Sequence, residues 1–489
     1  MYTLDTLPFK NRFAQLPAHF YARVAPTPLE NARLLSFNAA AAQLIQLDPA
    51  EAQNPNLVAY FNGERAWQGT QPVSMLYAGH QFGSYVPQLG DGRAMILGET
   101  QGWELQLKGS GPTPFSRGSD GRAVIRSTVR EYLCSEAMHG LGIPTTRALC
   151  MLISDEEVYR ERIEQAALLV RMAPSHLRFG SFEVFFHRRQ YAQLTELADF
   201  LLAQHFPELQ HQPEPYLALL EAVVKRTARL MAQWQCVGFA HGVMNTDNMS
   251  ILGLTLDYGP YGFLDVYEPG FISNHSDHEG RYAFDQQPSI GLWNLNALAH
   301  AFLPLLADDP DEAVEKARSA LWQYQPEFDQ AWLNGMRAKL GLQAEFAADQ
   351  ALIAELLTNM QQNLVDYTIF FRRLASLSRQ PQNTDTKVRD LFLERTAFES
   401  WVEHYRQRLA QEDSLDAQRH TQMRQVNPAY ILRNYMAQQA IEQAERGDAR
   451  EVERLLKLLQ QPFTEQVGME RYADHPPAWA DSISLSCSS

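Results

Sequence analysis

The strongest constraint on the fold of this chain is a change of sequence pattern along its length. Ten of its 27 glycines lie between Gly79 and Gly121, among short stretches of alternating apolar and polar residues. Trp103–Lys108 shows the alternation most clearly, and this alternation is typical of a strand. Beyond about residue 190 the pattern becomes helical, most strongly in Tyr216–Trp234. The sequence therefore predicts an α+β fold that is β-rich first and largely helical afterwards.

Individual elements can be placed within the β-rich part. We expect strands over 84–89, 94–98 and 103–108, with the tight turn Gly90-Asp91-Gly92-Arg93 joining the first two. A helix is predicted over 122–139, because Ile125, Val129 and Leu133 form one apolar stripe. Two further strands are predicted over 148–153 and 167–172.

This order of elements predicts two lobes with a cleft between them, where ligands commonly bind. We expect an N-terminal extension packed on the first lobe over residues 1–75 and a β-rich lobe over 76–190. A helical lobe follows over 191–461, interrupted by loops at 239–265, and residues 462–489 are expected to form an irregular tail.

The charge of the chain argues against general nucleic-acid binding. With 42 Lys and Arg against 57 Asp and Glu, the formal net charge is −15, and an acidic chain gains nothing from a phosphate backbone. The segment 86–130 has the opposite balance of charge, with six basic and four acidic residues. A locally basic segment in an acidic protein suits a small anionic ligand.

Cysteine usage and hydropathy indicate the compartment. The four cysteines, Cys134, Cys150, Cys236 and Cys487, match neither a zinc pattern nor a disulfide framework. The first residues lack the apolar core of a signal peptide, and no apolar run approaches the length of a membrane span. We therefore expect a cytoplasmic protein without a membrane partner.

The most informative motif is His241-Gly242-Val243-Met244-Asn245-Thr246-Asp247-Asn248, followed by Asp257-Tyr258-Gly259. His241 and Asn248 have the spacing of the kinase catalytic loop, and Asp257 begins a triplet in the place of D-F-G. Asn and Asp oxygens suit a Mg²⁺ ion that bridges phosphates. The kinase base position holds Val243, which cannot accept a proton, and Asp247 precedes the metal-ligand asparagine instead.

Other candidates are ambiguous as isolated residues. Lys108 and Glu131 suit a kinase-type ion pair between strand and helix, although two solvated charges are the commoner outcome. Gly90-Asp91-Gly92-Arg93 suits either a phosphate contact or an ordinary hairpin turn. Asp120 either lies beside a bound anion or caps the following helix.

Two arginines, two histidines and one cysteine are further candidates for a functional role. Arg171 and Arg178 are suited to bidentate phosphate contacts, with surface salt bridges as the alternative. His275 and His278 resemble a metal pair but lack further ligands, so a polar loop is favoured. Cys487 lies in a Ser-rich tail and is either redox-active or inert.

Several long motifs of this chain resemble those of the selenoprotein O family of pseudokinase-like protein adenylyltransferases, and the match covers nearly the whole length. The motifs are YAGHQFG, LGDGRA, LKGSGPTPFSRGSDGRA, STVREYLCSEAM, LGIPTTRAL, HGVMNTDNMSILGLTLDYGP and the Cys-Ser-Ser end. The resemblance implies a bilobal kinase-like fold that binds ATP in a flipped orientation. The implied reaction is transfer of AMP to Ser, Thr or Tyr hydroxyls of proteins, whose identity stays open, with release of pyrophosphate.

The resemblance also assigns roles to residues of this chain. It implies Asp247 as the proton acceptor, Asn248 and Asp257 as ligands of Mg²⁺ or Mn²⁺, and Glu131 as the partner of Lys108. The implied nucleotide contacts are Gly90, Gly92, Arg93, Lys108, Asp120, Gly121, Arg171, Arg178 and Asp257. Some members use UTP with manganese, so UMP transfer is an alternative.

The chain departs from the family in one respect. Some relatives pair the C-terminal cysteine with one that follows D-Y-G, whereas this chain has Ser273 and no cysteine in that segment. That redox switch is therefore not expected here. Two rival functions stay open, a protein kinase that transfers the γ-phosphoryl group and a non-catalytic scaffold that binds a nucleotide. Val243 argues against the kinase.

Overall fold

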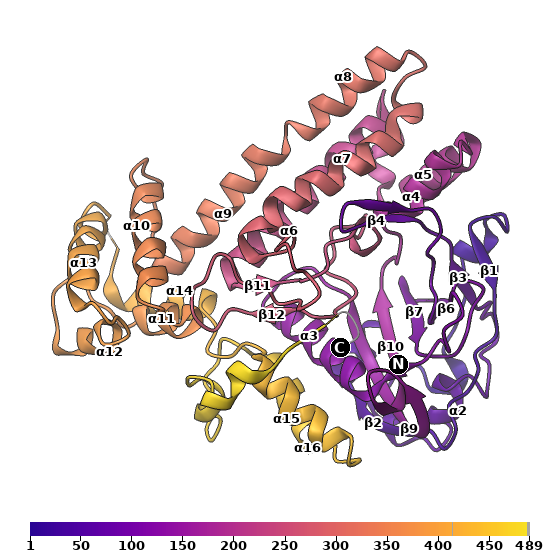
Figure 1. Cartoon of the computed structure of the whole chain (residues 1–489), viewed down its shortest axis with the longest axis horizontal. Coiled ribbons are helices and arrows are strands. Elements are labelled where there is room, and N and C mark those ends of the chain that lie inside the picture. Colours follow the sequence, from indigo (N-terminus) through magenta and orange to yellow (C-terminus); the bar gives the residue numbers. More distant parts are fainter. Residues whose placement is uncertain (413, 487–489) are drawn as a thin grey trace.

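The computed structural model describes residues 1–412 and 414–486 and shows a mixed α+β fold (Figure 1). An antiparallel sheet of eight strands occupies one side, with the order β1-β3-β6-β7-β10-β9-β2 and β8 paired to β10. The strands of this sheet are β1 (Tyr21–Arg23), β2 (Arg33–Phe37), β3 (Val73–Met75), β6 (Ala94–Thr100), β7 (Trp103–Lys108), β8 (Ala123–Val124), β9 (Arg147–Tyr159) and β10 (Ile163–Ala173). Two small two-stranded sheets pair β4 (Gly79–Gln81) with β5 (Ser84–Val86), and β11 (Phe239–Ala240) with β12 (Gly262–Phe263).

Alternate residues of each strand face opposite sides of the large sheet, and both sides are covered. Leu105 and Leu107 of β7 are fully buried in a core built with the N-terminal residues. On the other face, Ile96 and Leu169 pack in the main core with the helix α3 (Ile125–Gly140). The alternation leaves Gln106 and Lys108 on the α3 face of β7, because successive strand residues point to opposite faces.

The chain beyond the sheet is helical. The remaining helices are α1 (Ala39–Leu44), α2 (Leu57–Phe61), α4 (Phe179–His187), α5 (Tyr191–His205), α6 (Pro215–Val237), α7 (Gln287–Leu306), α8 (Pro310–Leu321), α9 (Tyr324–Leu340), α10 (Asp349–Gln362), α11 (Tyr367–Leu374), α12 (Thr386–Arg389), α13 (Arg395–Ala410), α14 (Asp416–Val426), α15 (Asn434–Ala444) and α16 (Arg450–Leu459). The long helices α7 and α9 both pack against α6, whereas α10–α14 form a group farther from the sheet (Figure 1). Finally, α15 and α16 return to pack on α3.

The N-terminal residues differ from the expectation of an extension that only packs on the first lobe. They supply β1, β2 and β3 to the sheet itself, with β2 paired to β9 and β3 paired to β6. These strands are three to five residues long. So few residues show little alternation, which explains why the sequence pattern did not reveal them.

The predicted hairpin around Gly90-Asp91-Gly92-Arg93 is wrong. Strand β5, which begins at Ser84, pairs with the preceding strand β4, whereas β6 pairs with β3 and β7. Gly90 has a φ of 92°, and a Cβ there would lie 2.5 Å from Phe115 Cγ. The Asp-Gly signal therefore reflects close packing against a distant loop rather than a turn between paired strands.

One stretch of the described residues, Phe284–Leu306, is long and apolar enough to span a membrane by length and composition. The expectation that no stretch comes close to this length is therefore wrong by that measure. Gln, Asn and Pro interrupt the apolar residues in the sequence, which hides the run. Leu295, Leu298 and Phe302 of this stretch are buried in the main core.

Candidate functional site

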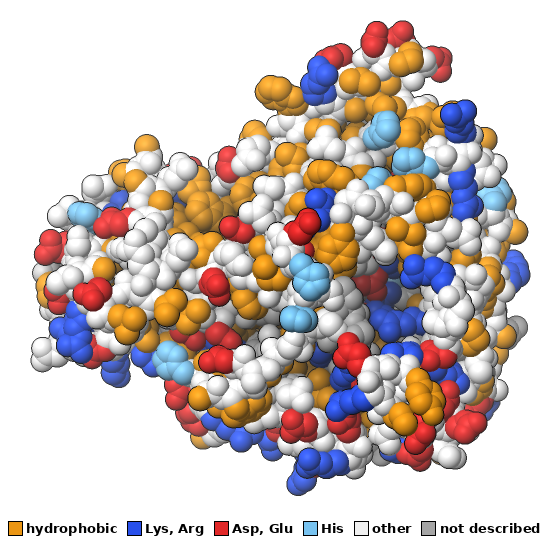
Figure 2. Space-filling view, viewed as in Figure 1, with side chains coloured by type: hydrophobic (Ala, Val, Ile, Leu, Met, Phe, Trp, Pro, Cys, Tyr) orange, Lys and Arg blue, Asp and Glu red, His pale blue; other side chains and the backbone are white. Residues whose placement is uncertain are grey.

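A cavity of about 740 Å³ lies between the sheet and the loops that follow α6. Its volume is typical of small-molecule sites. Six Lys and Arg side chains and four Asp and Glu side chains line it, in a protein of net charge −15. Figure 2 shows basic side chains gathered in a hollow over the strands of the large sheet. The cavity thus concentrates positive charge where a small anion can enter.

Lys108 and Glu131 form an ion pair across the cavity floor. The Lys108 Nζ donates to Glu131 Oε2 over 2.5 Å, which joins β7 to α3. The Arg171 Nη1 on β10 donates to the other oxygen, Oε1, over 2.9 Å. Lys108 is only 9% exposed and Glu131 3%, so the alternative of two solvated charges is wrong.

Asp257 is the centre of the charge network. Its Oδ1 accepts from Lys108 Nζ at 3.1 Å and Arg171 Nη1 at 2.5 Å, and its Oδ2 accepts from Arg178 Nη1 at 2.7 Å. Burial opposes ionisation, but Arg171, Lys108 and Arg178 outweigh it and hold the pKa of Asp257 well below its usual range. Asp257 also has a φ of 59°, unusual for a residue other than glycine.

Arg178 lies behind the cavity wall rather than in its lining. Besides Asp257, its Nη1 donates to the Asp247 carbonyl over 2.7 Å. Its guanidinium stands 4.5 Å from the centre of the Tyr77 ring. Arg178 therefore joins the two loops of the site, and the alternative of a surface salt bridge is excluded because this side chain is 1% exposed.

Asp247 is the carboxylate that remains chemically available. It lies in the single turn Thr246–Asn248 and is 7% exposed. Its Oδ2 accepts from Gln81 Nε2 over 3.2 Å, while its buried Oδ1 has no hydrogen-bond partner among the described residues. Burial raises the pKa of Asp247 to about 6, against the opposing effects of Gln81 and Arg178. The group is thus suited to accept a proton near neutral pH.

His241 joins the loop that contains Val243 to the segment that precedes Asp257. Its Nε2 donates to the Leu256 carbonyl over 2.9 Å, and its Nδ1 accepts from the Val243 backbone N–H over 3.4 Å. Burial lowers the pKa of His241, which keeps the ring in the neutral form that this bonding needs. The Val243 backbone carbonyl in turn accepts from Asn248 Nδ2 over 3.1 Å.

The donor atoms around the cavity fit a hard divalent cation. Asn248 donates through Nδ2, so Oδ1 is the amide atom left to bind a metal. A carboxylate has about four lone-pair positions, and three N–H donors occupy the oxygens of Asp257, which leaves room for one more bond. Asp247 lines the same cavity and adds a second carboxylate to it. Oxygen donors of this kind suit Mg²⁺ or Mn²⁺.

Arg93 and the neighbouring glycines form part of the cavity wall. Gly90, Gly92 and Arg93 all line it. Across residues 1–412 and 414–486, the Arg93 side chain has no ion-pair partner, and the same holds for Arg117. A Cβ on Gly92 would lie 2.9 Å from the Phe115 carbonyl oxygen. Arg93 and Arg117 therefore line the cavity without carboxylate partners among the described residues. The wall beside them has room for a glycine at position 92 but not for a larger residue.

Asp120 and Gly121 do not line the cavity. Asp120 accepts from the Arg122 N–H over 2.8 Å and pairs with Arg160 over 2.8 Å. It is not a helix cap, because α3 begins at Ile125 after the short strand β8. Gly121 has a φ of 69° and a Cβ there would lie 2.1 Å from the Gly111 carbonyl oxygen. Both residues shape the loop behind Arg160, which does line the cavity.

Gln106, Asp91 and Tyr77 were missed as site residues. Gln106 Oε1 accepts from Arg171 Nε over 3.0 Å and so orients that guanidinium. Asp91 is buried, which raises its pKa, and it lies 4.0 Å from Arg178 Nη2. Gln106 shares a strand face with Lys108, so the alternation of β7 held a signal for it. Tyr77 is the first residue of the motif YAGHQFG, so the resemblance held a signal for it.

The remaining candidates lie elsewhere. Asp277 accepts from the backbone N–H groups of Arg281 and Tyr282, as the polar-loop interpretation of His275 and His278 predicts. The Leu485 carbonyl accepts from the His275 N–H over 2.7 Å, so the end of the described chain lies on this loop. Cys487 falls outside the described residues, and its redox role stays a prediction.

Comparison with known proteins bears on the whole chain. The family model described as "Protein adenylyltransferase SelO" matches residues 3–460. The chain is similar to the protein nucleotidyltransferase YdiU of Thioalkalivibrio sulfidiphilus, with 58% identity over 494 residues and 100% of both chains covered. It is 55% identical to that of Myxococcus xanthus, again over 100% of both chains. It is 52% identical to that of Vibrio vulnificus, with 99% of both chains covered.

Proposed function

Because the chain belongs to the family of protein adenylyltransferase SelO, we propose that it transfers AMP from ATP to Ser, Thr or Tyr hydroxyls of proteins. UMP transfer from UTP is the variant of the same reaction. The observation that carries this proposal is the arrangement around Asp257. Three cations hold its carboxylate at the floor of a cavity that Asp247 also lines.

The site supports a kinase-like arrangement of two lobes around a nucleotide. A strand lysine paired with a helix glutamate, as Lys108 is with Glu131, positions phosphates in kinases. Asp257-Tyr258-Gly259 stands where kinases carry the metal-binding triplet. We assign residues 76–190 and 191–461 to the two lobes, with 1–75 joined to the first and 462–489 as a tail.

The proposed chemistry uses Asp247 as the proton acceptor. The acceptor hydroxyl oxygen forms a bond to the α-phosphorus, the bond from that phosphorus to the bridging oxygen breaks, and pyrophosphate leaves. The hydroxyl proton passes to the carboxylate of Asp247, which lines the cavity. With the nucleotide inverted relative to a kinase, no base is required at Val243.

The basic residues neutralise the phosphates. Lys108, Arg171 and Arg178 balance the three carboxylates that they contact, Glu131, Asp257 and Asp91. Arg93 adds a cation without a protein partner among the described residues. A Mg²⁺ or Mn²⁺ ion held by Asn248 and Asp257 would supply further charge neutralisation when bound. Positioning and charge neutralisation are the main requirements of such transfers.

The test labels ATP at either the α- or the γ-phosphate. Purified protein is incubated with Mg²⁺ or Mn²⁺, the labelled nucleotide and a cell extract that supplies acceptors, with Asn248→Ala as the control. We expect protein-bound label from the α-position only, and none with the control. A parallel reaction with α-labelled UTP decides between the nucleotides.

Two results would overturn the proposal. Label from the γ-position alone would establish a protein kinase. No label from any nucleotide, with binding retained, would establish a non-catalytic scaffold.

A further inference from the structure

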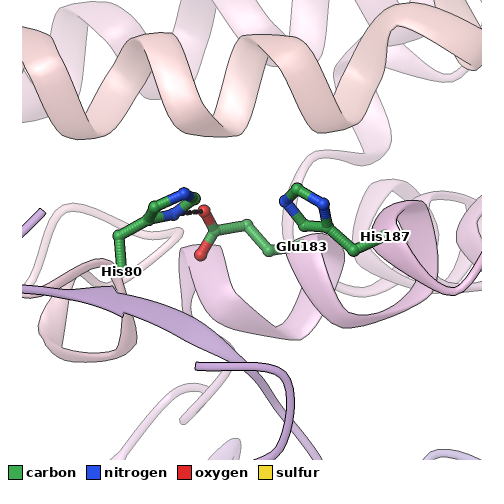
Figure 3. Close-up of side chains that lie close together, drawn as sticks. All are labelled: His80, Glu183 and His187. Atoms are coloured by element: carbon green, nitrogen blue, oxygen red, sulfur yellow. Dashed lines mark hydrogen bonds and ion pairs between the residues drawn. The ribbon is translucent and has the colours of Figure 1, made fainter. Parts of the chain in front are cut away.

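A second cluster of metal-ligating side chains lies outside the cavity. Glu183 and His187 stand one turn apart on α4, and His80 faces them from β4 (Figure 3). His80 Nδ1 lies 2.6 Å from Glu183 Oε1. One ligand atom from each of the three residues lies within 4.8 Å of the others. None of the three lines the nucleotide cavity.

Glu183 is the residue that makes this cluster unusual. Its side chain is completely buried, and across the described ranges, 1–412 and 414–486, no Lys or Arg pairs with it. Its oxygens contact only His80 and the Thr246 hydroxyl, at 2.6 and 2.5 Å, among the described residues. A buried carboxylate is normally paired with a cation or bound to a metal. The two histidines supply the cation only when one of them is protonated.

The histidines are placed to bind an ion from solvent. His187 is exposed and His80 is half-buried, so the cluster is open on one side. Figure 2 shows histidine side chains gathered on the surface over α4 and α7.

We propose that His80, Glu183 and His187 bind a divalent transition-metal ion of the zinc type, at a site separate from the nucleotide cavity. Two imidazoles and one carboxylate are a known ligand set for Zn²⁺, with a water as fourth ligand. Imidazole nitrogens suit zinc and its neighbours rather than Mg²⁺. The ion takes the place of the hydrogen bond between His80 Nδ1 and Glu183 Oε1.

The site is coupled to the catalytic loop through Thr246. The Thr246 hydroxyl donates to Glu183, and it accepts from the His80 backbone N–H over 2.7 Å. Thr246 precedes Asp247 directly. The bound ion therefore fixes α4, β4 and the loop of Asp247 relative to one another, which makes the three ligands positioning residues rather than catalytic ones.

The test measures Zn²⁺ binding to the full-length protein by competition with a chromophoric chelator. His187→Ala removes an exposed ligand without disturbing the core. His404→Ala is the matched control, because His404 also pairs with a glutamate, Glu355, at 3.0 Å but belongs to no cluster of three such ligands among the described residues. Asn248→Ala removes a ligand of the proposed cavity metal.

We expect one tightly bound Zn²⁺ in the wild-type, His404→Ala and Asn248→Ala proteins. Affinity should fall by more than about tenfold in His187→Ala, since even outer-shell changes cost that much. Zn²⁺ should also raise the Tm of the wild type but not of His187→Ala. Equal affinity in His187→Ala and the wild type would overturn the proposal. So would the absence of binding to the wild type at micromolar Zn²⁺, or loss of that binding in Asn248→Ala.

Discussion

At the scale of single residues, the two proposed metal ligands differ in how strongly the fold depends on them. Asp257 accepts from three buried cations, whereas Asn248 donates one hydrogen bond to Val243. Removing one partner of a buried charge network leaves the others uncompensated in a low-dielectric interior. Both substitutions remove a metal ligand, but only the first removes a structural charge.

We therefore expect Asn248→Ala and Asp257→Ala both to abolish transfer but to differ in stability. Asp257→Ala should lower the free energy of unfolding by about 3–5 kcal/mol, as for other broken buried ion pairs. Asn248→Ala should lower it by about 0.5–1.5 kcal/mol, the contribution of one hydrogen bond. Urea denaturation of both variants measures the difference. Equal stability would show that the cations around Asp257 do not depend on it.

The pH dependence of activity tests the assignment of Asp247. Its pKa is raised to about 6, first by burial, and a proton acceptor must be ionised. The kcat/KM should therefore decline as the pH falls through about 6, because this ratio reports groups of the free enzyme. The Gln81 hydrogen bond lowers the pKa of Asp247, so Gln81→Leu should raise that pKa and move the acid limb to higher pH.

Gln88→Leu is the control for this profile. Gln88 is an exposed glutamine of the same segment and accepts from Arg188 rather than contacting Asp247. Its profile should match that of the wild type. An acid limb that stays in place in Gln81→Leu would contradict the assignment of Asp247.

At the scale of elements, the short strand β4 lies directly against the catalytic loop. A Cβ on Gly79 would lie 2.6 Å from Asp247 Oδ1 and 3.0 Å from the Asp247 backbone nitrogen. Real Cβ atoms do not approach this closely, so either β4 or the loop must move. The glycine therefore sets the distance between the strand and the proposed base.

We expect Gly79→Ala to lower kcat by at least about 100-fold, since small misplacements of catalytic groups have effects of that size. Gly270→Ala is the matched control, because a Cβ there meets nothing within 4 Å. Kinetic assays give kcat, and near-UV circular dichroism checks that both variants keep their tertiary packing. Wild-type kcat in Gly79→Ala would contradict the tight contact.

At the scale of the whole molecule, one glutamine joins three distant parts of the chain. Gln460, just beyond α16, donates to Asn38 Oδ1 over 3.0 Å and to Glu136 Oε2 of α3 over 3.1 Å. Glu136 is fully buried and is also held by Arg147 over 2.7 Å. This contact anchors the C-terminal helices to the sheet side of the protein.

Gln460→Ala should lower the free energy of unfolding by about 1.5–3 kcal/mol, the range for a hydrogen bond to a charged group. Nucleotide binding should be unchanged, because Gln460 does not line the cavity. The neighbouring Gln461 is exposed, so Gln461→Ala should change the free energy of unfolding by less than about 0.5 kcal/mol. Chemical denaturation compares the two, and equal losses would contradict the anchoring role.

Local sequence pattern was enough to predict some parts of this protein. The alternation of Trp103–Lys108 predicted β7 at its observed bounds, and the spacing of His241, Asn248 and Asp257 predicted two loops that the structure brings to one cavity. These signals are local, because strand alternation and loop spacing depend on neighbouring residues. The long family motifs added the reaction class.

Contacts between distant segments could not be predicted in this way and follow from tertiary packing. The partners of β5 and the edge strands β1 and β2 depend on pairings between remote residues, so the Asp-Gly turn signal misled. The role of Asp120 likewise depends on a remote residue, because it binds Arg160 instead of capping α3. His80 and Glu183 are 103 residues apart, and only the packing of β4 on α4 brings them together. Contacts of this range depend on the packing of the whole core, which no local pattern records.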